Sequence, residues 1–492
     1  MLTFISRLWS EQTPPPPGMR VVPCSPLDIP TIDMVLTTSW VVDARLDPRI
    51  LEETLKVLVE KKFPRAGARL VRRNGIYEFH IPEKFTAEHP PVAFTSTHTP
   101  EPYETPARVA ECGSIARLRD DAAKRAEPST WPSLRVASIL RAPTCPSGVQ
   151  GFLQPDTPFV HVHAASFTDL TFVSVTSSHA MFDAIGVKTF VHAWTRLISG
   201  ENIDDIEGMD WDAQPFASFA KEPAPEGWAC QRGWFVLGLF SMISWVLQLI
   251  LRTMRDPEDA GRLVCLPKVF LEDEKRKILD ELKAEGSEEW VGSSDVLMAW
   301  WMKTLYAHRT DPTLIQIQTP VNLRDYEVFP TPSKTIGMPY IHNVLLYIPL
   351  APFNLASLRD MSMRDVALHF RRAILAYNAD LEAIKNDLRV VCGNPGATLF
   401  PSLPGAEFGI ITNWRKAKLL EVDFSGAIEG DVKQQKASVV WVTGLNSSDK
   451  KLPMQGSGGI FFETDDAIWA GGIRGAKDWE RIKEAGHIAF SC

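Results

Sequence analysis

The spacing of apolar residues changes from that of a strand to that of a helix within one short stretch of the chain. Over 171–178 the apolar residues stand among β-branched neighbours, as they do in a strand. Over 185–198 they recur at helical spacing, with Asp183 at the N-cap position and Gly186 allowing a close approach in the first turn. The pattern predicts a strand that leads directly into a helix and holds His179 at the junction.

The same analysis predicts alternating strands and helices along both halves of the chain. In the first half we expect strands over 34–42, 75–81, 133–141, 159–163 and 171–177, and helices over 48–62, 114–125 and 187–199. In the second half we expect helices over 271–285, 294–306 and 363–383, and strands over 314–321, 344–350, 437–443 and 459–463. A chain of 492 residues exceeds one comfortable core, so we predict two α/β domains, 1–205 and 263–492, joined by a crossover over 206–262.

The crossover contains one apolar segment, 234–251, in which Ser241, Ser244 and Gln248 are the only polar residues. Its 18 residues are just long enough to span a bilayer. If the active site needs both halves, a simple span would place them on opposite sides of the membrane, and we exclude it. An in-plane membrane helix, a short re-entrant hairpin and an ordinary buried helix all remain open.

Composition argues against a nucleic-acid-binding protein and against a disulfide-rich or zinc-binding one. Apolar residues make up 45% of the chain, and a net charge of −8 argues against a nucleic-acid partner. The seven cysteines form no Cys-x-x-Cys pair, which favours a reducing compartment without a disulfide framework or a zinc site. Residues 1–9 lack the apolar core of a secretory signal, and the prolines over 14–17 predict a stiff leader. We therefore expect a cytoplasmic protein.

His179 is the strongest candidate for chemistry. An imidazole with a pKa of about 6.5 is largely neutral near pH 7 and could act as a general base. On the His-x-x-x-Asp motif alone, a buried structural histidine beside a helix cap is the commoner case.

Two other patterns carry weaker signals. His161 and His163 share one strand face without a third ligand, so we expect no metal site. The Gly-Ser-Gly-Gly run over 456–459 looks like a phosphate-binding loop but lacks its lysine and its strand-to-helix context. We predict a hairpin or loop there.

Segments in six regions of the chain resemble, in order, motifs of the BAHD acyltransferases, in particular their fungal branch that includes trichothecene acetyltransferases. They are Phe63-Pro64-Arg65-Ala66-Gly67-Ala68-Arg69-Leu70, His179-Ala180-Met181-Phe182-Asp183, Ser293-Ser294-Asp295-Val296-Leu297-Met298-Ala299-Trp300-Trp301, Val321-Asn322-Leu323-Arg324, Pro339-Tyr340-Ile341-His342-Asn343, and Ile411-Thr412-Asn413-Trp414 with Val422-Asp423-Phe424-Ser425-Gly426. Their order and spacing agree over nearly the whole chain. Ser425 and Ala427 depart from the family's last glycine motif, whose tryptophan is absent.

The resemblance implies two similar α/β domains of the chloramphenicol-acetyltransferase type with a tunnel between them. It implies an acyl-CoA-dependent O-acyltransferase, and most simply transfer of acetyl from acetyl-CoA to a hydroxyl of a secondary metabolite such as a terpenoid. The partners would be the acyl-CoA co-substrate and a hydroxylated small-molecule acceptor, with no permanently bound cofactor. We expect a monomer.

The resemblance also assigns roles to residues. His179 becomes the catalytic base, and Thr412 and Trp414 become candidate donors to the negatively charged oxygen that forms during attack. Asp183 would pair with Arg324 and fix the loop that presents the histidine.

Other residues have supporting roles. Asn343 and Asp423 are expected to serve the architecture of the site. Arg415, Lys416 and Lys418 form the nearest basic group for the phosphates of coenzyme A, although a solvated charged face explains them equally well.

Two other functions remain open. A condensation-type catalyst would take its acyl group from a carrier protein, but that family usually has a second histidine where this chain has Ser178. A catalytically inactive, membrane-associated binding protein is the non-enzymatic alternative. Contact with an intracellular membrane through 234–251 is compatible with each function.

Overall fold

The computed structural model describes residues 16–232, 235–236, 238–328, 339–394, 399–400, 406–430, 436–450 and 454–491. The predictions for residues 1–9, Pro14, Pro15, Trp234 and Cys492 lie outside these ranges. The six cysteines within them are all free.

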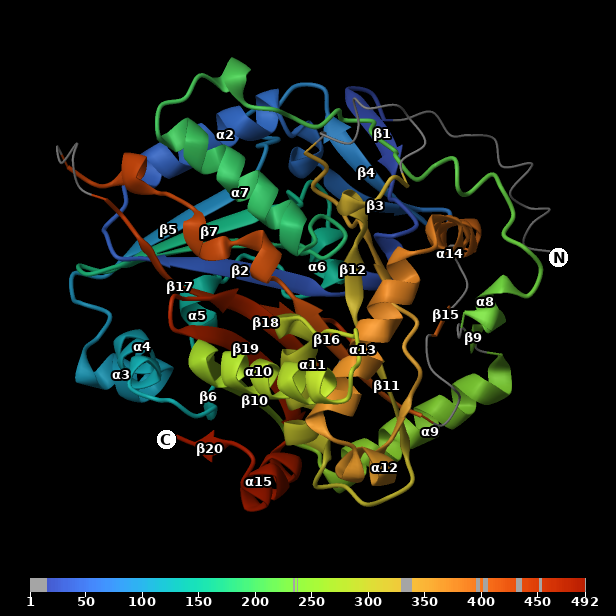
Figure 1. The fold of residues 1–492 in the computed structure, drawn as a ribbon. Coiled ribbons are helices and arrows are strands. Elements are labelled where there is room, and N and C mark those ends of the chain that lie inside the picture. Colours follow the sequence, from blue (N-terminus) through green and yellow to red (C-terminus); the bar gives the residue numbers. More distant parts are fainter. Residues whose placement is uncertain are drawn as a thin grey trace.

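One sheet belongs mainly to the first half of the chain. Its strand order is β17-β2-β8-β7-β5, with β7 and β5 parallel and every other pair antiparallel. Helices α2 (Pro48–Lys61) and α7 (Ala184–Ile198) lie side by side against this sheet (Figure 1). The indole N–H of Trp194 in α7 donates to the Thr54 hydroxyl of α2 at 3.0 Å, which fixes the two helices against each other.

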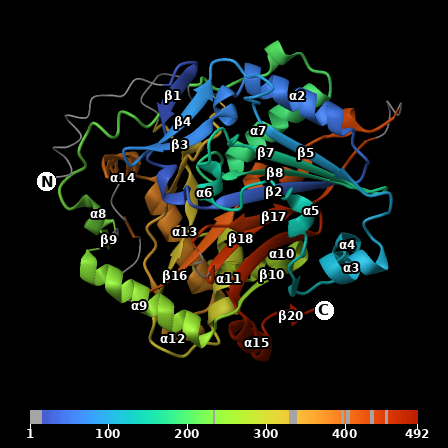
Figure 2. The same ribbon diagram turned by 180° about the vertical axis from the view of Figure 1, so that it is seen from behind.

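A second, eight-stranded sheet belongs mainly to the second half. Its order is β14-β11-β16-β18-β19-β10-β6-β20, in which β11, β16 and β18 run parallel. Helices α10, α11 and α13 lie together over one face of this sheet, and Figure 2 shows the molecule from behind.

Each large sheet contains a strand from the other half of the chain. Strand β17 (Val439–Ser447) pairs with β2 in the first sheet, and β6 (Ser129–Pro132) pairs with β10 in the second. The two halves are therefore interlocked. The domain limits at 205 and 263 remain a prediction, and β10 already begins at Asp259.

The strands are β1 Met19–Pro23, β2 Val35–Val42, β3 Arg69–Arg73, β4 Ile76–Pro82, β5 Ala93–His98, β6 Ser129–Pro132, β7 His161–Ser166, β8 Thr171–Ser178, β9 Phe235–Val236, β10 Asp259–Pro267, β11 Leu314–Gln318, β12 Pro320–Asn322, β13 Leu345–Tyr347, β14 Phe353–Asn354, β15 Leu399–Phe400, β16 Glu407–Asn413, β17 Val439–Ser447, β18 Ser457–Glu463, β19 Ala467–Gly475 and β20 Ala489–Phe490. The helices are α2 Pro48–Lys61, α3 Pro106–Cys112, α4 Ile115–Ala123, α5 Ala137–Leu140, α6 Val149–Phe152, α7 Ala184–Ile198, α8 Trp228–Gln231, α9 Leu239–Arg255, α10 Lys268–Ala284, α11 Ser293–Tyr306, α12 Leu355–Asp360, α13 Met363–Asn378, α14 Leu381–Gly393 and α15 Ala476–Ala485.

Three of the predicted elements differ in the structure, and one of them, the single strand over 314–321, is two strands, β11 and β12, in different sheets. The predicted strand over 133–141 is instead a loop followed by the short helix α5, because its buried apolar residues Val136 and Leu140 are four apart, which is a helical spacing. The predicted single helix over 363–383 is two helices, α13 and α14. Asp380 separates them, since its carboxylate accepts from the Ala383 N–H at 2.8 Å and starts α14 as its N-cap.

The apolar segment of the crossover forms helix α9, Leu239–Arg255, which lies along the outside of the molecule (Figures 1 and 2). None of its residues is fully buried, so the ordinary buried helix is wrong. Within the described ranges, no helix combines the length and the apolar character that crossing a membrane requires.

Candidate active site

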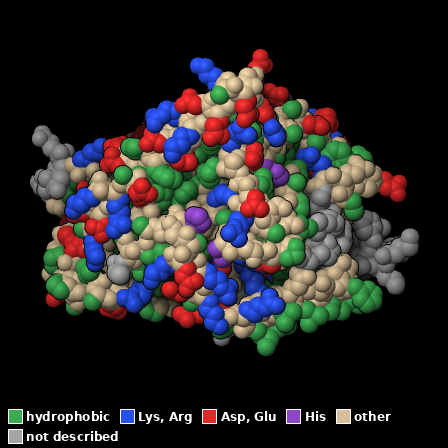
Figure 3. All heavy atoms as spheres, turned by 60° about the horizontal axis from the view of Figure 1, so that its bottom comes forward, with side chains coloured by type: hydrophobic (Ala, Val, Ile, Leu, Met, Phe, Trp, Pro, Cys, Tyr) green, Lys and Arg blue, Asp and Glu red, His purple; other side chains and the backbone are tan. Residues whose placement is uncertain are grey.

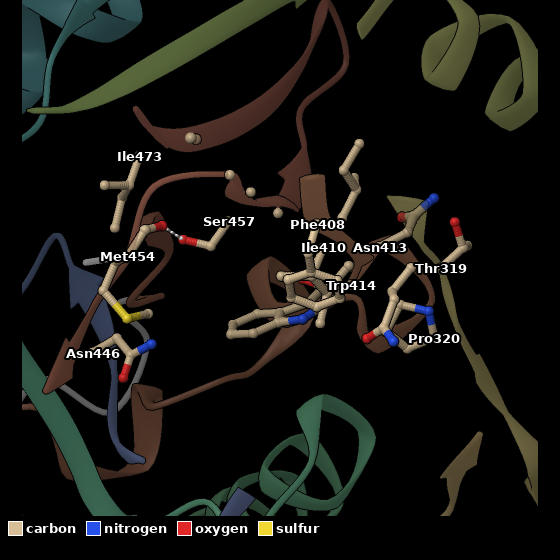
Figure 4. Close-up of a pocket in the computed structure, with 18 of the residues that line it drawn as sticks. Thr319, Pro320, Phe408, Ile410, Asn413, Trp414, Asn446, Met454, Ser457 and Ile473 are labelled. Atoms are coloured by element: carbon tan, nitrogen blue, oxygen red, sulfur yellow. Dashed lines mark hydrogen bonds between the residues drawn. The ribbon is translucent and has the colours of Figure 1, made fainter. Parts of the chain in front are cut away.

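A cavity of about 2230 Å³ lies between the two large sheets. Its lining includes Leu36 of β2 and Val442 of β17 from the first sheet, and Thr412 of β16 and Gly459 of β18 from the second. Figure 4 shows part of this cavity, with Phe408 and Ile410 of β16 and Trp414 among the labelled residues that line it. His179 also lines the cavity, so residues from both halves of the chain surround one space.

His179 is held by its backbone at the end of β8. Its N–H donates to the Met34 carbonyl at 2.7 Å, and its carbonyl accepts from the Asn343 side-chain amide at 2.8 Å. The preceding residue, Ser178, is fully buried and donates its hydroxyl to the Ile32 carbonyl at 2.6 Å. The strand end is therefore rigid, as the sequence pattern predicts, and the imidazole is presented to the cavity from a fixed backbone.

The surroundings of His179 favour its neutral form. Burial lowers the pKa of the imidazole below its ordinary value, and the nearby Asp183 carboxylate opposes this only in part. Within the described part of the chain, Nδ1 makes no hydrogen bond. A neutral imidazole at pH 7 has the protonation state that a general base requires.

The predicted pair between Asp183 and Arg324 is present in the structure. Arg324 Nη1 donates to Asp183 Oδ2 at 2.8 Å, and the two side chains are 17% and 7% exposed. The same oxygen accepts from the Val344 N–H at 3.0 Å, while Oδ1 caps α7 by accepting from the Gly186 N–H at 2.7 Å. Each carboxylate oxygen thus already has protein donors, which fits a structural role for Asp183.

Arg324 ties the motif of the first half to a loop of the second half. Its Nη2 donates to the Tyr340 carbonyl at 2.9 Å and to the His342 carbonyl at 2.8 Å. The guanidinium therefore joins the start of α7 to the 340–344 segment. Arg324 itself does not line the cavity.

Gly186 makes the close approach that its position predicts. A Cβ at this residue would lie 1.9 Å from the backbone carbonyl oxygen of Ile341. Any side chain would therefore push the first turn of α7 away from the 340–344 segment.

Behind His179, Asn343 links the histidine to a buried carboxylate that sequence reasoning missed. The Asn343 side-chain amide donates both to the His179 carbonyl at 2.8 Å and to Asp28 Oδ1 at 2.9 Å. Asp28 is 1% exposed, and burial raises its pKa to about 7 despite the hydrogen bonds from Asn343. The sequence signal was slight, since Asp28 follows Ser25-Pro26-Leu27 in a loop that predicts only a turn.

Thr412 and Trp414 offer hydrogen-bond donors to the cavity. Thr412 lies opposite Gly459 across the parallel pair β16–β18, and Trp414 follows β16 with its ring edge-on to Phe461 at 5.8 Å. Across the described residues, neither the Thr412 hydroxyl nor the Trp414 indole N–H has a hydrogen-bond partner, and both residues line the cavity. These donors are therefore available to a bound molecule.

Glycines of β18 leave space for the side chains of Thr412 and Trp301. A Cβ on Gly459 would lie 2.9 Å from the Thr412 hydroxyl oxygen, and one on Gly458 would lie 2.8 Å from the Trp301 ring. The Gly-Ser-Gly-Gly run therefore begins strand β18, and only Gly456, with φ of +90°, lies in the preceding turn. The prediction of a hairpin or loop over all four residues is wrong, because three of them pair in the sheet.

The proposed phosphate-binding group lines the cavity but is paired within the protein. Arg415 donates to the Ser294 hydroxyl at 2.5 Å and contacts Glu463 at 3.4 Å. Lys416 pairs with Asp325 at 3.1 Å, and its side chain is 80% exposed. Lys418 pairs with Glu421 at 2.9 Å. The two lysine pairs are exposed and therefore weak, so a phosphate could displace their carboxylates.

Asp423 lies apart from the other candidates. It lines a separate small pocket against the end of α7 and accepts from the Ser425 N–H at 2.9 Å. In the same loop, a Cβ on Gly426 would lie 2.2 Å from the Ile198 carbonyl oxygen. This loop packs against the C-terminal end of α7 and does not face the main cavity.

The paired histidines of β7 make structural contacts. His163 Nδ1 is 2.8 Å from the Thr95 hydroxyl, and His161 packs edge-on against Phe152 at 5.6 Å. In the part of the chain that is described, no group of three or more histidine, cysteine or acidic side chains is placed to hold a metal.

The chain is similar in sequence to fungal acetyltransferases. No family model matches the chain. It is 27% identical over 419 residues to acetyltransferase adrJ of Penicillium roqueforti, which covers 80% of this chain and 79% of that protein. It is 24% identical to O-acetyltransferase PaAT-2 of Phomopsis amygdali, with 95% of this chain and 98% of that protein covered.

The fold is that of a solved fungal acetyltransferase. The crystal structure of F. graminearum TRI101 complexed with ethyl coenzyme A matches with a TM-score of 0.66 at 12% identity, over 95% of this chain and 97% of that one. The predicted two-domain α/β fold and the resemblance to fungal acetyltransferases are both confirmed.

Proposed function

We propose that this chain, a relative of the fungal acetyltransferases with their two-domain fold, transfers an acetyl or other acyl group from a coenzyme A thioester to a hydroxyl of a secondary metabolite such as a terpenoid. One observation carries the proposal. A histidine with a lowered pKa lines the cavity between the two sheets together with Thr412 and Trp414, two hydrogen-bond donors without a partner among the described residues.

His179 is the base in this reaction. An alcohol is a weak nucleophile until its proton is removed, and a positioned base accelerates the attack by about 10²–10⁴. The imidazole takes the proton of the acceptor hydroxyl as its oxygen bonds to the thioester carbonyl carbon. When the tetrahedral intermediate collapses, the carbon–sulfur bond breaks and His179 returns the proton to the leaving thiolate, so that free coenzyme A and the ester leave.

Thr412 and Trp414 stabilise the intermediate. Negative charge develops on the former carbonyl oxygen during attack, and one donor aimed at that oxygen lowers the activation barrier by about 3–4 kcal/mol. Thr412 lies on β16 of the second sheet and Trp414 directly follows that strand, whereas His179 directly follows β8 of the first sheet. The reaction therefore requires that the two halves of the chain hold a fixed position relative to each other.

Asp183, Arg324 and Asn343 hold the site. The Asp183–Arg324 pair and the Asn343 amide tie the His179 segment to residues 340–344 of the second half. Arg415, Lys416 and Lys418 are the proposed contacts for the coenzyme A phosphates. Asp423 supports the fold at the end of α7. We place the enzyme in the cytoplasm as a monomer.

Release of free coenzyme A thiol tests the proposal. The purified protein is incubated with acetyl-CoA and an extract of fungal hydroxylated metabolites, and thiol release is followed together with mass gain in the extract. We expect thiol release that depends on the extract and a new product heavier by one acetyl group. No product from acetyl-CoA, but product from an acetylated carrier protein, would favour a condensation-type catalyst. No product from either donor would favour a binding protein.

A further inference from the structure

Helix α9 has two faces of opposite character. Seven apolar residues on its outer face are 39% to 86% exposed, and we call them the outer stripe. They are Leu239, Phe240, Ile243, Val246, Leu247, Ile250 and Met254. At 100° per residue they fall within an arc of about 120°. Figure 3 shows hydrophobic side chains gathered along the rim of the molecule where α9 lies.

The inner face of the same helix forms part of the cavity wall. Trp245, Gln248, Leu249 and Arg252 line the cavity, and these residues lie on the side of the helix opposite the outer stripe. No residue of the outer stripe lines the cavity, whereas the neighbouring Leu251, which is 52% exposed, does. The stripe is therefore unnecessary for closing the cavity.

The C-terminal end of α9 is fixed to the rest of the protein. Asp256, which follows the helix, accepts from the Asp478 N–H at 3.0 Å and so caps α15. The Asp256 carbonyl accepts from the Gln455 side chain at 2.7 Å. A helix anchored at this end presents the outer stripe to water, and a contiguous exposed apolar stripe is a candidate site of interaction.

We propose that the outer stripe docks on a lipid bilayer, with α9 lying in the plane of the membrane surface. The helix has 17 residues, and at 1.5 Å per residue it is about 25 Å long. A stripe about 10 Å wide then covers on the order of 250 Å², far less than the roughly 800 Å² that each partner of a stable protein pair buries. A single protruding helix suits insertion between lipid headgroups better than a second copy of this chain.

The charges of α9 agree with a lipid partner. The helix contains no acidic residue, and Arg252 and Arg255 occupy its last turn. Arg252 lies on the inner face toward the cavity, whereas Arg255 is exposed and lies nearer the outer stripe, where its guanidinium can meet anionic headgroups. An in-plane helix with basic residues on its polar side binds membranes by this combination. The inference does not depend on the proposed reaction.

Vesicle flotation of the full chain tests the docking surface. The wild type is mixed with vesicles of phosphatidylcholine and phosphatidylserine at three to one, and compared with Phe240→Ser/Leu247→Ser/Met254→Ser. The matched control replaces three exposed apolar residues on other elements, Ile76→Ser/Val269→Ser/Leu375→Ser. Circular dichroism establishes that each protein is folded.

The results distinguish a lipid bilayer from a second copy of the chain as the partner of the outer stripe. We expect the wild type and the control triple variant to float with vesicles, and the α9 triple variant to lose at least a hundredfold in partition, since each exposed apolar side chain contributes roughly tenfold. Wild type that stays with the soluble fraction, or equal losses in both triple variants, would overturn the proposal. A dimer at micromolar concentration that only the α9 variant dissociates would show that a second copy covers the stripe, and would overturn it too.

Discussion

Replacing Asp183 by asparagine tests whether this carboxylate holds the site together or takes part in chemistry. The substitution keeps one oxygen that can still cap α7 through the Gly186 N–H. It replaces the other oxygen by an amide NH2 group, which then faces two donors, Arg324 Nη1 at 2.8 Å and the Val344 N–H at 3.0 Å. Donor then faces donor, and the guanidinium loses its counter-charge.

The structure sets the size of the effect. Both partners are less than a fifth exposed, at 17% and 7%, so water screens the pair weakly. Removing one partner of a buried pair typically destabilises a protein by about 3–5 kcal/mol. Arg324 keeps its bonds to the Tyr340 and His342 carbonyls, which places the expected loss near the lower end, at about 3 kcal/mol.

Urea unfolding followed by circular dichroism measures this loss, with Glu289→Gln as the matched control. Glu289 pairs with Arg372 on the surface, where the side chains are 40% and 63% exposed, and such pairs contribute about 0–1 kcal/mol. We expect Asp183→Asn to lower the unfolding midpoint far more than the control and to reduce activity in step. Equal midpoints for both variants would refute the structural role. A stable variant as inactive as His179→Ala would show that Asp183 acts on the substrate.

Three further predictions follow from the same geometry. Thr412→Val removes the hydroxyl and keeps the shape, so steady-state kinetics should show a lower kcat with little change in KM; a higher KM at unchanged kcat would make Thr412 a binding residue. Asp28 has its pKa raised from 3.8 to about 7, so its contribution to stability is fully present below pH 4 and is lost as the pH rises to 7, by on the order of 4 kcal/mol; Asp28→Asn should flatten the dependence of the urea midpoint on pH over this window, and an unchanged slope would contradict the burial argument. Gly186→Ala places a Cβ 1.9 Å from the Ile341 carbonyl oxygen and should destabilise the protein by several kcal/mol in the same assay, whereas Gly393→Ala, with open space around it, should change stability by less than about 1 kcal/mol; equal effects would show that the first turn of α7 can move.

The junction around His179 was predictable because its elements are local. The spacing of apolar residues changes from that of a strand to that of a helix, and Asp183 as N-cap marks where the helix starts. The strand must therefore end just before it. The structure agrees within a few residues, with β8 ending at Ser178 and α7 beginning at Ala184.

Contacts between distant segments were not predictable from the pattern. The register that sets β17 beside β2, and the bonds from Asn343 to Asp28 and to His179, join residues that are at least 164 positions apart. No spacing rule encodes these contacts, and the pairing of Asp183 with Arg324 was expected only from the family resemblance. The exposure of α9 on the outside of the molecule was also not predictable, because an apolar run fits burial in the protein and contact with lipid equally well.

The acyl-transfer rate of His179→Ala tests the central claim most directly. The imidazole is asked to carry a proton and not to pack, so the variant should fold normally and still bind coenzyme A, while kcat falls by about 10²-fold or more. His98→Ala, at an exposed histidine at the end of β5, is the control and should keep the wild-type rate. Because burial lowers the pKa of His179, the wild-type rate should persist below pH 6.5 and fall only in more acidic solution. Retention of more than about a tenth of the wild-type rate by His179→Ala would contradict the assignment of this residue as the base.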